Sequence, residues 1–247
     1  VYGLAPKRLV KTGFPLLDSL LDEVAQLTQR DAEAAPQERP RILIAPSWQV
    51  DNIFDYCLDD LLDNLLQGNY QITLRPHPEY AKRFPEKLAQ IEANYAEHMG
   101  ANLSLERDFS SNETVYQSDL IITDWSTIAH EFSYATKRPC LFIMNPNYQK
   151  IAAVPLDISL RDQLGISLDV DKLDQAVATV DHLLTHRAEY HAQITRVMEE
   201  NIYNIGHSAD VGGRYLMMRV EENQLQAKQE EADYQALLQG KTRKRAE

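Results

Sequence analysis

The sequence predicts an α/β fold in which a Rossmann-like parallel sheet is covered by helices on both faces. Five short apolar runs alternate with segments of helical periodicity, at residues 42–45, 72–74, 103–105, 120–122 and 140–143. Continuous apolar runs are typical of strands buried on both faces, and their alternation with helices is typical of βαβ units. We expect a sixth strand at 166–168.

The helices are predicted from apolar residues spaced three and four apart. The first carries Leu17, Leu20, Leu21, Val24 and Leu27, and a polar, proline-bounded linker at 31–40 follows it. Later helices are expected over 54–66 and 84–95, around Thr114, directly after Ser126, over 173–184, and on to about Glu222. After Asn145 we expect a proline-interrupted loop, and the last residues are expected to form a solvated helix with a frayed end.

These elements suggest three parts. Residues 1–40 would be a helix and linker from an N-terminal domain outside the sequence, 41–222 a Rossmann-like nucleotide-binding domain, and 223–247 a helical or frayed tail. The chain begins at Val1 and enters a helical pattern almost at once, so we expect that it comes from a longer protein.

Composition limits the classes of function. The chain has 247 residues, 28.3 kDa, 44% hydrophobic residues and a net charge of −12, which fit a folded globular protein and argue against a general nucleic-acid binder. It contains no apolar run long enough to span a membrane and no signal segment. Cys57 and Cys140 are far apart and suggest no disulfide or zinc site, so a reducing cytoplasm is the expected compartment.

Polar clusters follow three of the predicted strands, where an open parallel sheet binds its ligands. They are Pro46-Ser47-Trp48-Gln49, Arg75-Pro76-His77-Pro78 and Thr123-Asp124-Trp125-Ser126-Thr127. Ser47, Trp48 and Gln49 are candidates for nucleotide or loop contacts. Arg75 and His77 each precede a proline that restricts their backbone, so they would form a phosphate clamp or, equally, be solvated residues at a strand end.

The third cluster lies where a strand passes into a helix. Free N–H groups and the positive dipole end at the helix start, together with the hydroxyls of Ser126 and Thr127, would suit a pyrophosphate. Asp, Ser and Thr are also the preferred N-caps, and capping is compatible with phosphate binding.

Other patterns are weaker. Asp169-Val170-Asp171 matches a metal-binding D-x-D pattern, but Asp171 is more simply a helix cap; His182 and His186 have metal-pair spacing but are expected to be surface residues. The glycine-rich dinucleotide, P-loop and nucleophile-elbow motifs are absent.

Taken in order, five segments resemble the CDP-glycerol glycerophosphotransferases, the family of teichoic acid and related capsule polymerases. The segments are Gly13-Phe14-Pro15-Leu16-Leu17-Asp18, Ile44-Ala45-Pro46-Ser47-Trp48, Arg75-Pro76-His77-Pro78, Ser118-Asp119 with Ile122-Thr123-Asp124-Trp125-Ser126-Thr127, and Lys137-Arg138-Pro139. A fainter likeness lies at Asn204-Ile205-Gly206-His207-Ser208.

The resemblance implies the C-terminal, donor-binding domain of a GT-B type transferase active in bacterial cell-envelope biosynthesis. Such an enzyme would move glycerol phosphate, or a similar polyol phosphate, from a CDP donor to a growing polymer or lipid-linked acceptor. It would need no cofactor and no dedicated metal. It would be cytoplasmic, and peripheral contact with the inner face of the plasma membrane would come from the missing part.

The resemblance also implies roles for individual residues. His77 would be catalytic, and the donor diphosphate would bind Arg75 and His77 on one side and Thr123, Asp124, Ser126 and Thr127 on the other. The acceptor-activating base would lie in the missing domain, because no matching histidine segment is present. The fragment alone is therefore expected to be inactive.

Gln49 departs from the family pattern, which usually has a basic residue there, and this leaves the donor or acceptor open. Two other functions remain as alternatives. One is a GT-B glycosyltransferase that uses a nucleotide sugar, and the other is a non-catalytic nucleotide-binding module. Arg107, Lys137 and Arg138 are further cations that would offset the negative charge of the chain, although Lys137 and Arg138 better fit a helix C-terminus.

Overall fold

The computed structural model describes residues 9–33, 37–49, 51–145 and 155–243, and the chain forms two units. One unit is Ser19–Asn201, and the other combines Val1–Asp18 with Ile202–Glu247. The expected division into parts after residues 40 and 222 stays a prediction. Most of the predicted proline-interrupted loop, at 146–154, and the last four residues lie outside the described residues.

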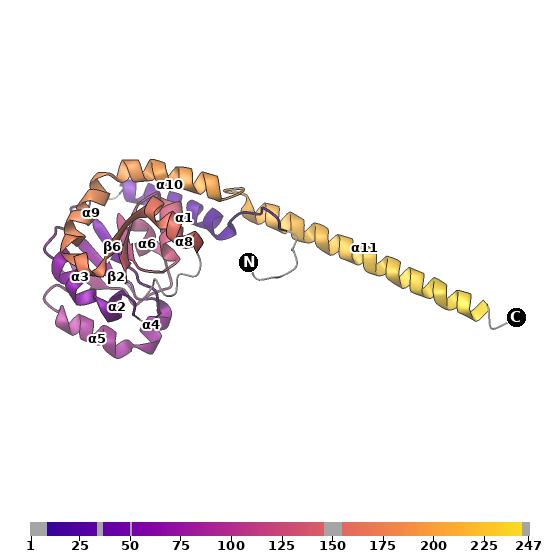
Figure 1. The fold of residues 1–247 in the computed structure, drawn as a ribbon, viewed down its shortest axis with the longest axis horizontal. Coiled ribbons are helices and arrows are strands. Elements are labelled where there is room, and N and C mark those ends of the chain that lie inside the picture. Colours follow the sequence, from indigo (N-terminus) through magenta and orange to yellow (C-terminus); the bar gives the residue numbers. More distant parts are fainter. Residues whose placement is uncertain (1–8, 34–36, 50, 146–154, 244–247) are drawn as a thin grey trace. The chain divides into compact units, whose positions relative to one another are not determined.

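The unit Ser19–Asn201 contains a six-stranded sheet in which every pairing is parallel (Figure 1). Its strands are β1 (Arg41–Ile44), β2 (Gln71–Leu74), β3 (Leu103–Leu105), β4 (Leu120–Thr123), β5 (Cys140–Met144) and β6 (Gly165–Asp169). The spatial order is β3-β2-β1-β4-β5-β6, so strand order reverses between β1 and β4. The predicted parallel α/β sheet is confirmed, including its sixth strand.

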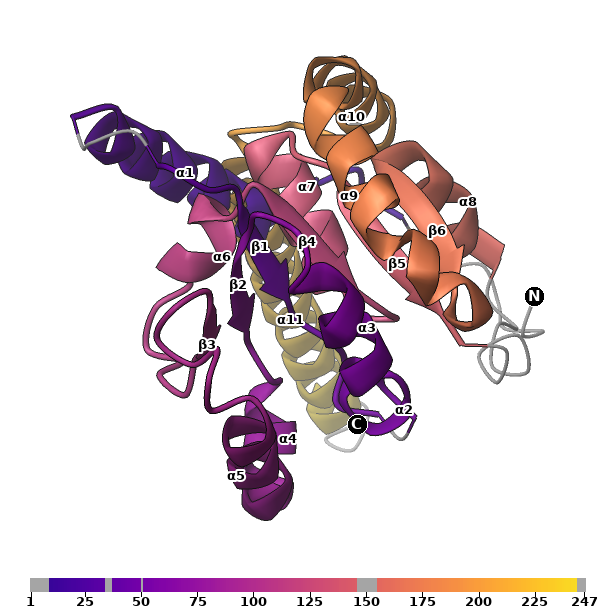
Figure 2. The same ribbon diagram turned by 90° about the vertical axis from the view of Figure 1, so that its left-hand side faces the viewer.

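Helices occupy the connections between strands. They are α1 (Pro15–Glu33), α2 (Ile53–Tyr56), α3 (Leu58–Leu65), α4 (Pro78–Arg83), α5 (Pro85–Asn94), α6 (Glu113–Gln117), α7 (Ile128–Thr136), α8 (Pro155–Leu164), the 3₁₀ helix η2 (Val170–Gln175), α9 (Ala176–Thr185), α10 (Arg187–Asn201) and α11 (Ser208–Arg243). Figure 2 shows α3 and α9 in front of the sheet and α6 and α7 behind it. The sheet is thus covered on both faces, as predicted.

The main hydrophobic core lies between the sheet and the helices α3, α5 and α9. Ile44, Ile72 and Ile122 of adjacent strands are fully buried there, together with Leu61 of α3 and Val180 of α9. Burying such aliphatic side chains contributes roughly 1.5–3 kcal/mol each. This core explains why the strands read as continuous apolar runs.

Three elements differ from the prediction. The helix expected over 54–66 is broken at Cys57, whose φ of −152° is not helical, so α2 and α3 are separate. Asp169, not Asp171, occupies the N-cap position before η2, and no side chain caps it. Helix α8 appears where only a loop was expected. Helix α11 runs on to Arg243, where a solvated helix was expected, and three Gln–carboxylate pairs between residues 226 and 235 support it.

Three buried tyrosines bind carboxylates on acidic helices. The hydroxyl of Tyr70 donates to Asp181 at 2.5 Å, that of Tyr80 to Asp55 at 2.8 Å, and that of Tyr95 to Asp59 at 3.0 Å. Each bond connects residues at least 25 positions apart. Desolvation first, and then the bonded carboxylate, raises the pKa of each phenol above its usual value of 10.0.

In the unit Val1–Asp18 with Ile202–Glu247, one carboxylate makes several of the bonds between the two segments. Asp18 accepts hydrogen bonds from the backbone N–H groups of Gly206 and Ser208, both at 2.7 Å, and from the Ser208 hydroxyl at 3.2 Å. It therefore caps α11 from a position 190 residues away in sequence. Gly13 has a φ of +105°, and a Cβ there would lie 2.2 Å from the carbonyl oxygen of Tyr203. Residues 13–18 and 204–208, which both resemble family motifs, therefore pack against each other.

None of the described helices is both long enough and apolar enough to cross a bilayer.

The tyrosine–carboxylate bonds predict an alkaline loss of stability. Because folding raises the pKa of Tyr70, Tyr80 and Tyr95, their contribution is complete below the unfolded pKa of about 10 and falls as pH rises above it. Urea unfolding followed by circular dichroism from pH 8 to 11.5 will show a falling free energy of unfolding. Tyr70→Phe should cost about 1–2 kcal/mol at pH 8 and reduce the alkaline slope. Tyr234→Phe, at an exposed position on α11, is the control. Equal slopes for Tyr70→Phe and the unmutated chain would contradict the prediction.

Candidate functional site

The candidate site lies at the carboxyl edge of the sheet, where strand order reverses. In open parallel sheets the connections leave toward opposite faces at this point, and a ligand-binding crevice results. Here the reversal lies between β1 and β4, which pair in parallel through Ile42–Leu120 and the residues that follow. Segments after β1, β2 and β4 carry the three predicted polar clusters.

Asp124 connects the segments after β4 and β1. Its carboxylate is buried and accepts hydrogen bonds from the backbone N–H of Ser47 at 2.7 Å and of Ile53 at 3.4 Å. The adjacent Thr123 hydroxyl is also buried and donates to the carbonyl oxygen of Ala45 at 2.7 Å. Both side chains therefore position the loop after β1. Their predicted contact with a diphosphate stays a prediction.

The loop after β1 presents its three candidate residues differently. Ser47 is 6% exposed, and its hydroxyl has no hydrogen-bond partner among the residues that the structure describes. Trp48 is 43% exposed, and Gln49 is exposed with its carbonyl oxygen bound by the Asn52 side chain. A buried hydroxyl without a partner costs free energy, so Ser47 Oγ is suited to a ligand atom at this edge.

Arg75 holds the segment after β3. Its guanidinium is buried, lies 2.6 Å from the Glu106 carboxylate, and donates to the Ser111 carbonyl and the Asn112 side chain, both at 2.9 Å. Glu106 neutralises this charge locally. The sequence did not reveal these partners, and the predicted diphosphate contact of Arg75 stays a prediction.

His77 is the N-cap of α4. Its Nδ1 accepts a hydrogen bond from the backbone N–H of Glu79 at 3.1 Å, which places the proton of the neutral ring on Nε2. Desolvation lowers the pKa of His77 below its usual 6.5. His77 is therefore a neutral Nε2–H donor at pH 7. The cationic form considered from the sequence would lose the cap.

The start of α7 carries two hydroxyls that are not used for capping. Thr127 occupies the N-cap position without a side-chain cap bond, and no described residue hydrogen-bonds to the hydroxyl of Ser126 or Thr127. Ser126 is half-buried and Thr127 is exposed. The N–H of His130 donates to the Thr127 carbonyl oxygen at 3.0 Å, but no described residue accepts from the N–H of Ile128 or Ala129. These two N–H groups and the positive end of the nine-residue helix are thus available to an anion.

Two arginine–tryptophan stacks flank this edge, and neither was predicted from the sequence. The guanidinium of Arg161 lies 4.2 Å from the ring centre of Trp125, and that of Arg83 lies 5.1 Å from the ring centre of Trp48. Arg161 is 3% exposed, whereas the Arg83 side chain is 54% exposed. These pairs could not be seen in the sequence, because Arg83 lies 35 positions after Trp48 and Arg161 lies 36 positions after Trp125.

The remaining candidates have structural or surface positions. Lys137 is the left-handed C-cap of α7, and Arg138 donates to the carbonyl oxygens of Tyr116 and Ser118 at 3.0 and 2.6 Å, which confirms the preferred interpretation. His182 and His186 stack at the surface, 4.1 Å between ring centres. Within the described ranges no three His, Cys, Asp or Glu side chains are grouped to hold a metal. The expected absence of a dedicated metal stays a prediction.

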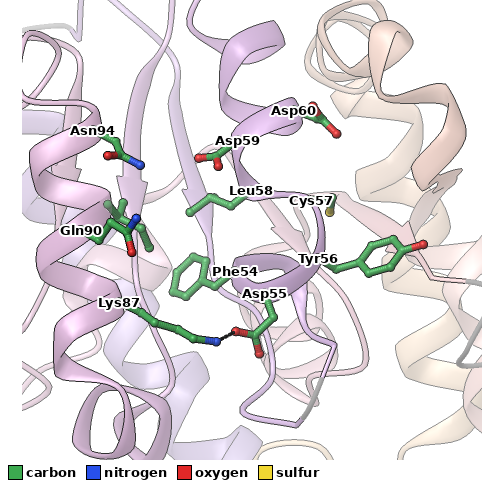
Figure 3. A pocket seen from close by; sticks show the side chains of 11 residues that line it. Phe54, Asp55, Tyr56, Cys57, Leu58, Asp59, Asp60, Lys87, Gln90 and Asn94 are labelled. Atoms are coloured by element: carbon green, nitrogen blue, oxygen red, sulfur yellow. Dashed lines mark hydrogen bonds and ion pairs between the residues drawn. The ribbon is translucent and has the colours of Figure 1, made fainter.

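A groove of about 390 Å³ lies between α2–α3 and α5 and contains none of the predicted site residues. Figure 3 shows Gln90 and Asn94 on one wall and Asp55 and Asp59 on the other. Asp55 is paired with Lys87 and bound by Tyr80, and Asp59 is bound by Tyr95. Because carboxylates dominate this lining, the groove does not favour a phosphorylated ligand.

The bonds of Asp124 predict the effect of replacing it. Asp124→Asn keeps the shape but substitutes an amide for a carboxylate that accepts two backbone N–H groups, so the free energy of unfolding should fall by about 1–3 kcal/mol. Amide hydrogen exchange at Ser47 and Ile53 should become faster than in the unmutated chain. Asp108→Asn, in an exposed turn where the carboxylate accepts from Ser110, is the control. Unchanged exchange at Ser47 would show that Asp124 does not hold the loop.

Comparisons with known proteins give the family and the fold of the chain. The family model described as CDP-Glycerol:Poly(glycerophosphate) glycerophosphotransferase matches residues 1–153. No curated protein matches the chain. Among solved structures, the wall teichoic acid polymerase TagF is similar, as a variant with CDPG (19% identity, TM-score 0.57, 89% of this chain and 53% of that chain) and as another variant (18%, 0.56, 87% and 53%).

The UDP-GlcNAc 2-epimerase of Methanocaldococcus jannaschii, in complex with UDP-GlcNAc and UDP, is also similar (15% identity, TM-score 0.54, 87% of this chain and 56% of that chain). The chain therefore spans about half the length of the solved structures that it matches. These likenesses show the fold, which is the Rossmann-like α/β fold of GT-B type proteins. With the match over residues 1–153, the chain belongs to the CDP-glycerol:poly(glycerophosphate) glycerophosphotransferase family.

Proposed function

We propose that this chain is the donor-binding, C-terminal half of a transferase that moves glycerol phosphate, or a similar polyol phosphate, from a CDP donor. The acceptor would be a growing cell-surface polymer or a lipid-linked molecule. The observation that carries the proposal is the uncapped start of α7, where the free hydroxyls of Ser126 and Thr127 follow directly after the Asp124 that holds the opposite loop. Family membership supports the reaction class.

The geometry suits a nucleoside diphosphate. Attack on the donor phosphorus places charge on the transferred phosphoryl group and on the leaving CMP, and fixed donors around the diphosphate stabilise that charge. The α7 N–H groups and the two hydroxyls would contact the phosphoryl oxygens. The Nε2–H of His77 would donate from the opposite side, and the Ser47 hydroxyl would bind a further oxygen or the nucleoside.

Several parts of the proposal concern the whole enzyme. The acceptor-activating base would come from an N-terminal half, so this chain alone would bind the donor without transferring it. We propose that the reaction uses no organic cofactor and no dedicated metal. The enzyme would work in the cytoplasm, where it would meet its lipid-linked acceptor at the inner face of the plasma membrane.

Ser126→Ala tests the diphosphate site. Calorimetric titration of the chain with CDP-glycerol, CDP, UDP and sugar nucleotides should show cytidine-selective binding that survives chelation of divalent ions. Loss of one hydroxyl donor to a charged oxygen should weaken CDP-glycerol binding about 10-fold. Ser167→Ala, at an exposed position on β6, is the matched control. Preference for a sugar nucleotide would identify a glycosyltransferase, and unchanged affinity in Ser126→Ala would contradict the proposed site.

His77→Asn separates the two roles of His77. Asparagine is a good N-cap, so α4 should remain intact while the Nε2–H donor is lost. Binding of CDP-glycerol should weaken about 5–10-fold, with a melting temperature close to that of the unmutated chain. His77→Ala should lower both, because the cap is lost as well. Equal affinity of His77→Asn and the unmutated chain would remove His77 from the site.

The pH dependence of binding reports the protonation state of His77. Since desolvation lowers its pKa below 6.5, the ring is neutral above that pH, and affinity for CDP-glycerol should be level from pH 6.5 to 8.5. A clamp based on an imidazolium ion would instead weaken as pH rises through 6.5. Titrations in buffers of matched ionic strength distinguish the two, with His77→Asn as the reference. A tenfold loss of affinity across this range, absent in His77→Asn, would contradict the neutral donor.

A further inference from the structure

The site needs a cation that the predicted residues do not supply. The chain carries a net charge of −12, and a diphosphate adds further negative charge. Arg75 is neutralised by Glu106 at 2.6 Å, and His77 is a neutral ring at pH 7 because its Nδ1 caps α4. Gln49 is uncharged. N–H groups and hydroxyls bind the oxygens but leave the charge uncompensated.

Arg83 is placed to supply this charge. It ends α4, the helix that begins at His77, and its guanidinium lies 5.1 Å from the ring centre of Trp48. Trp48 in turn lies 6.3 Å from the His77 ring, measured between ring centres. The three side chains therefore form a continuous surface along the loop after β1. With 54% of its side chain exposed, Arg83 is accessible to a ligand.

Stacking on Trp48 also restricts the arginine. A guanidinium held over an indole ring can still donate from the N–H groups at its edge, and it loses fewer conformations on binding an anion than a free arginine does. Arg161 has the same kind of stack on Trp125, but at 3% exposure it is not accessible to a ligand. Of the two stacked arginines, only Arg83 can make a direct contact.

We propose that Arg83, stacked on Trp48 beside His77, is the cationic contact for the diphosphate of the nucleotide donor. This inference rests on the proposed function. Glu79 is the internal competitor, because its carboxylate lies 3.3 Å from Arg83 Nε in an exposed ion pair one helical turn away. Binding of the donor would exchange this pair for a guanidinium–phosphate contact.

The test uses the 247-residue chain with two probes that differ only in phosphate, CDP and cytidine. Arg83→Gln should weaken CDP binding about 5–10-fold and leave cytidine binding unchanged, since the lost contact is charge-assisted and partly solvent-screened. Glu79→Gln should strengthen CDP binding about twofold by removing the competitor, while its backbone N–H still binds His77. Arg30→Gln and Glu113→Gln, which break another exposed ion pair on α1 and α6, are the matched controls.

The outcomes separate this inference from the proposed function. If CDP binds and Ser126→Ala weakens it while Arg83→Gln does not, the role of Arg83 is overturned and the donor site stands. Equal weakening of CDP and cytidine in Arg83→Gln would indicate a loosened loop and would also overturn the inference. If the unmutated chain binds no CDP, the proposed function and this inference fail together. Opposite changes in Arg83→Gln and Glu79→Gln, with unchanged controls, support it.

Discussion

The hydrogen bonds from the backbone of Ser47 and Ile53 to Asp124 are the contacts on which the site depends. Parallel strands β1 and β4 bring their ends to one edge, but the backbone pairing of strands stops there. Beyond that point the N–H groups of the loop after β1 need other hydrogen-bond acceptors, because the loop is buried at Ser47. Asp124, in the segment that leads into α7, accepts two such donors and fixes this loop. This edge of the sheet is therefore bordered by backbone that is held in place before a ligand arrives.

That arrangement explains how an acidic chain can hold an anion. The buried polar groups Thr123, Asp124 and Arg75 are bound by protein atoms, so their bonds position the loops at this edge of the sheet. Groups that remain available are less buried and mostly neutral: the α7 N–H groups, two hydroxyls and the Nε2–H of His77. Neutral donors select a ligand by the positions of its oxygen atoms. They do not compensate the negative charge of the ligand, which is left to an exposed cation such as Arg83.

The sequence predicted the sheet well because each strand is buried on both faces and reads as an apolar run. It did not predict the break at Cys57, since Phe54 to Leu66 keeps one helical period across it. Helix α8 was missed because Pro155 and weak periodicity suggested a loop. In the site, the strand ends predicted where the polar clusters lie. They did not predict which residues bind Arg75, or that His77 caps α4. The local sequence at a strand end does not show whether a side chain there binds its own chain or a ligand.

Two motif aspartates illustrate why the resemblance could not assign roles by itself. Asp18 binds backbone N–H groups of a turn 190 residues away, and Asp124 binds a loop 77 residues away. Both carboxylates are saturated by backbone donors, and each shapes a turn next to a helix start. At α11 the carboxylate itself occupies the helix start, whereas at α7 no side chain caps it. Where a carboxylate of the chain binds the N–H groups of a helix start, its role is structural. Where no side chain binds them, a phosphate can bind instead. This difference between the two helix starts, which the motifs do not reveal, is why we propose α7 as the donor site.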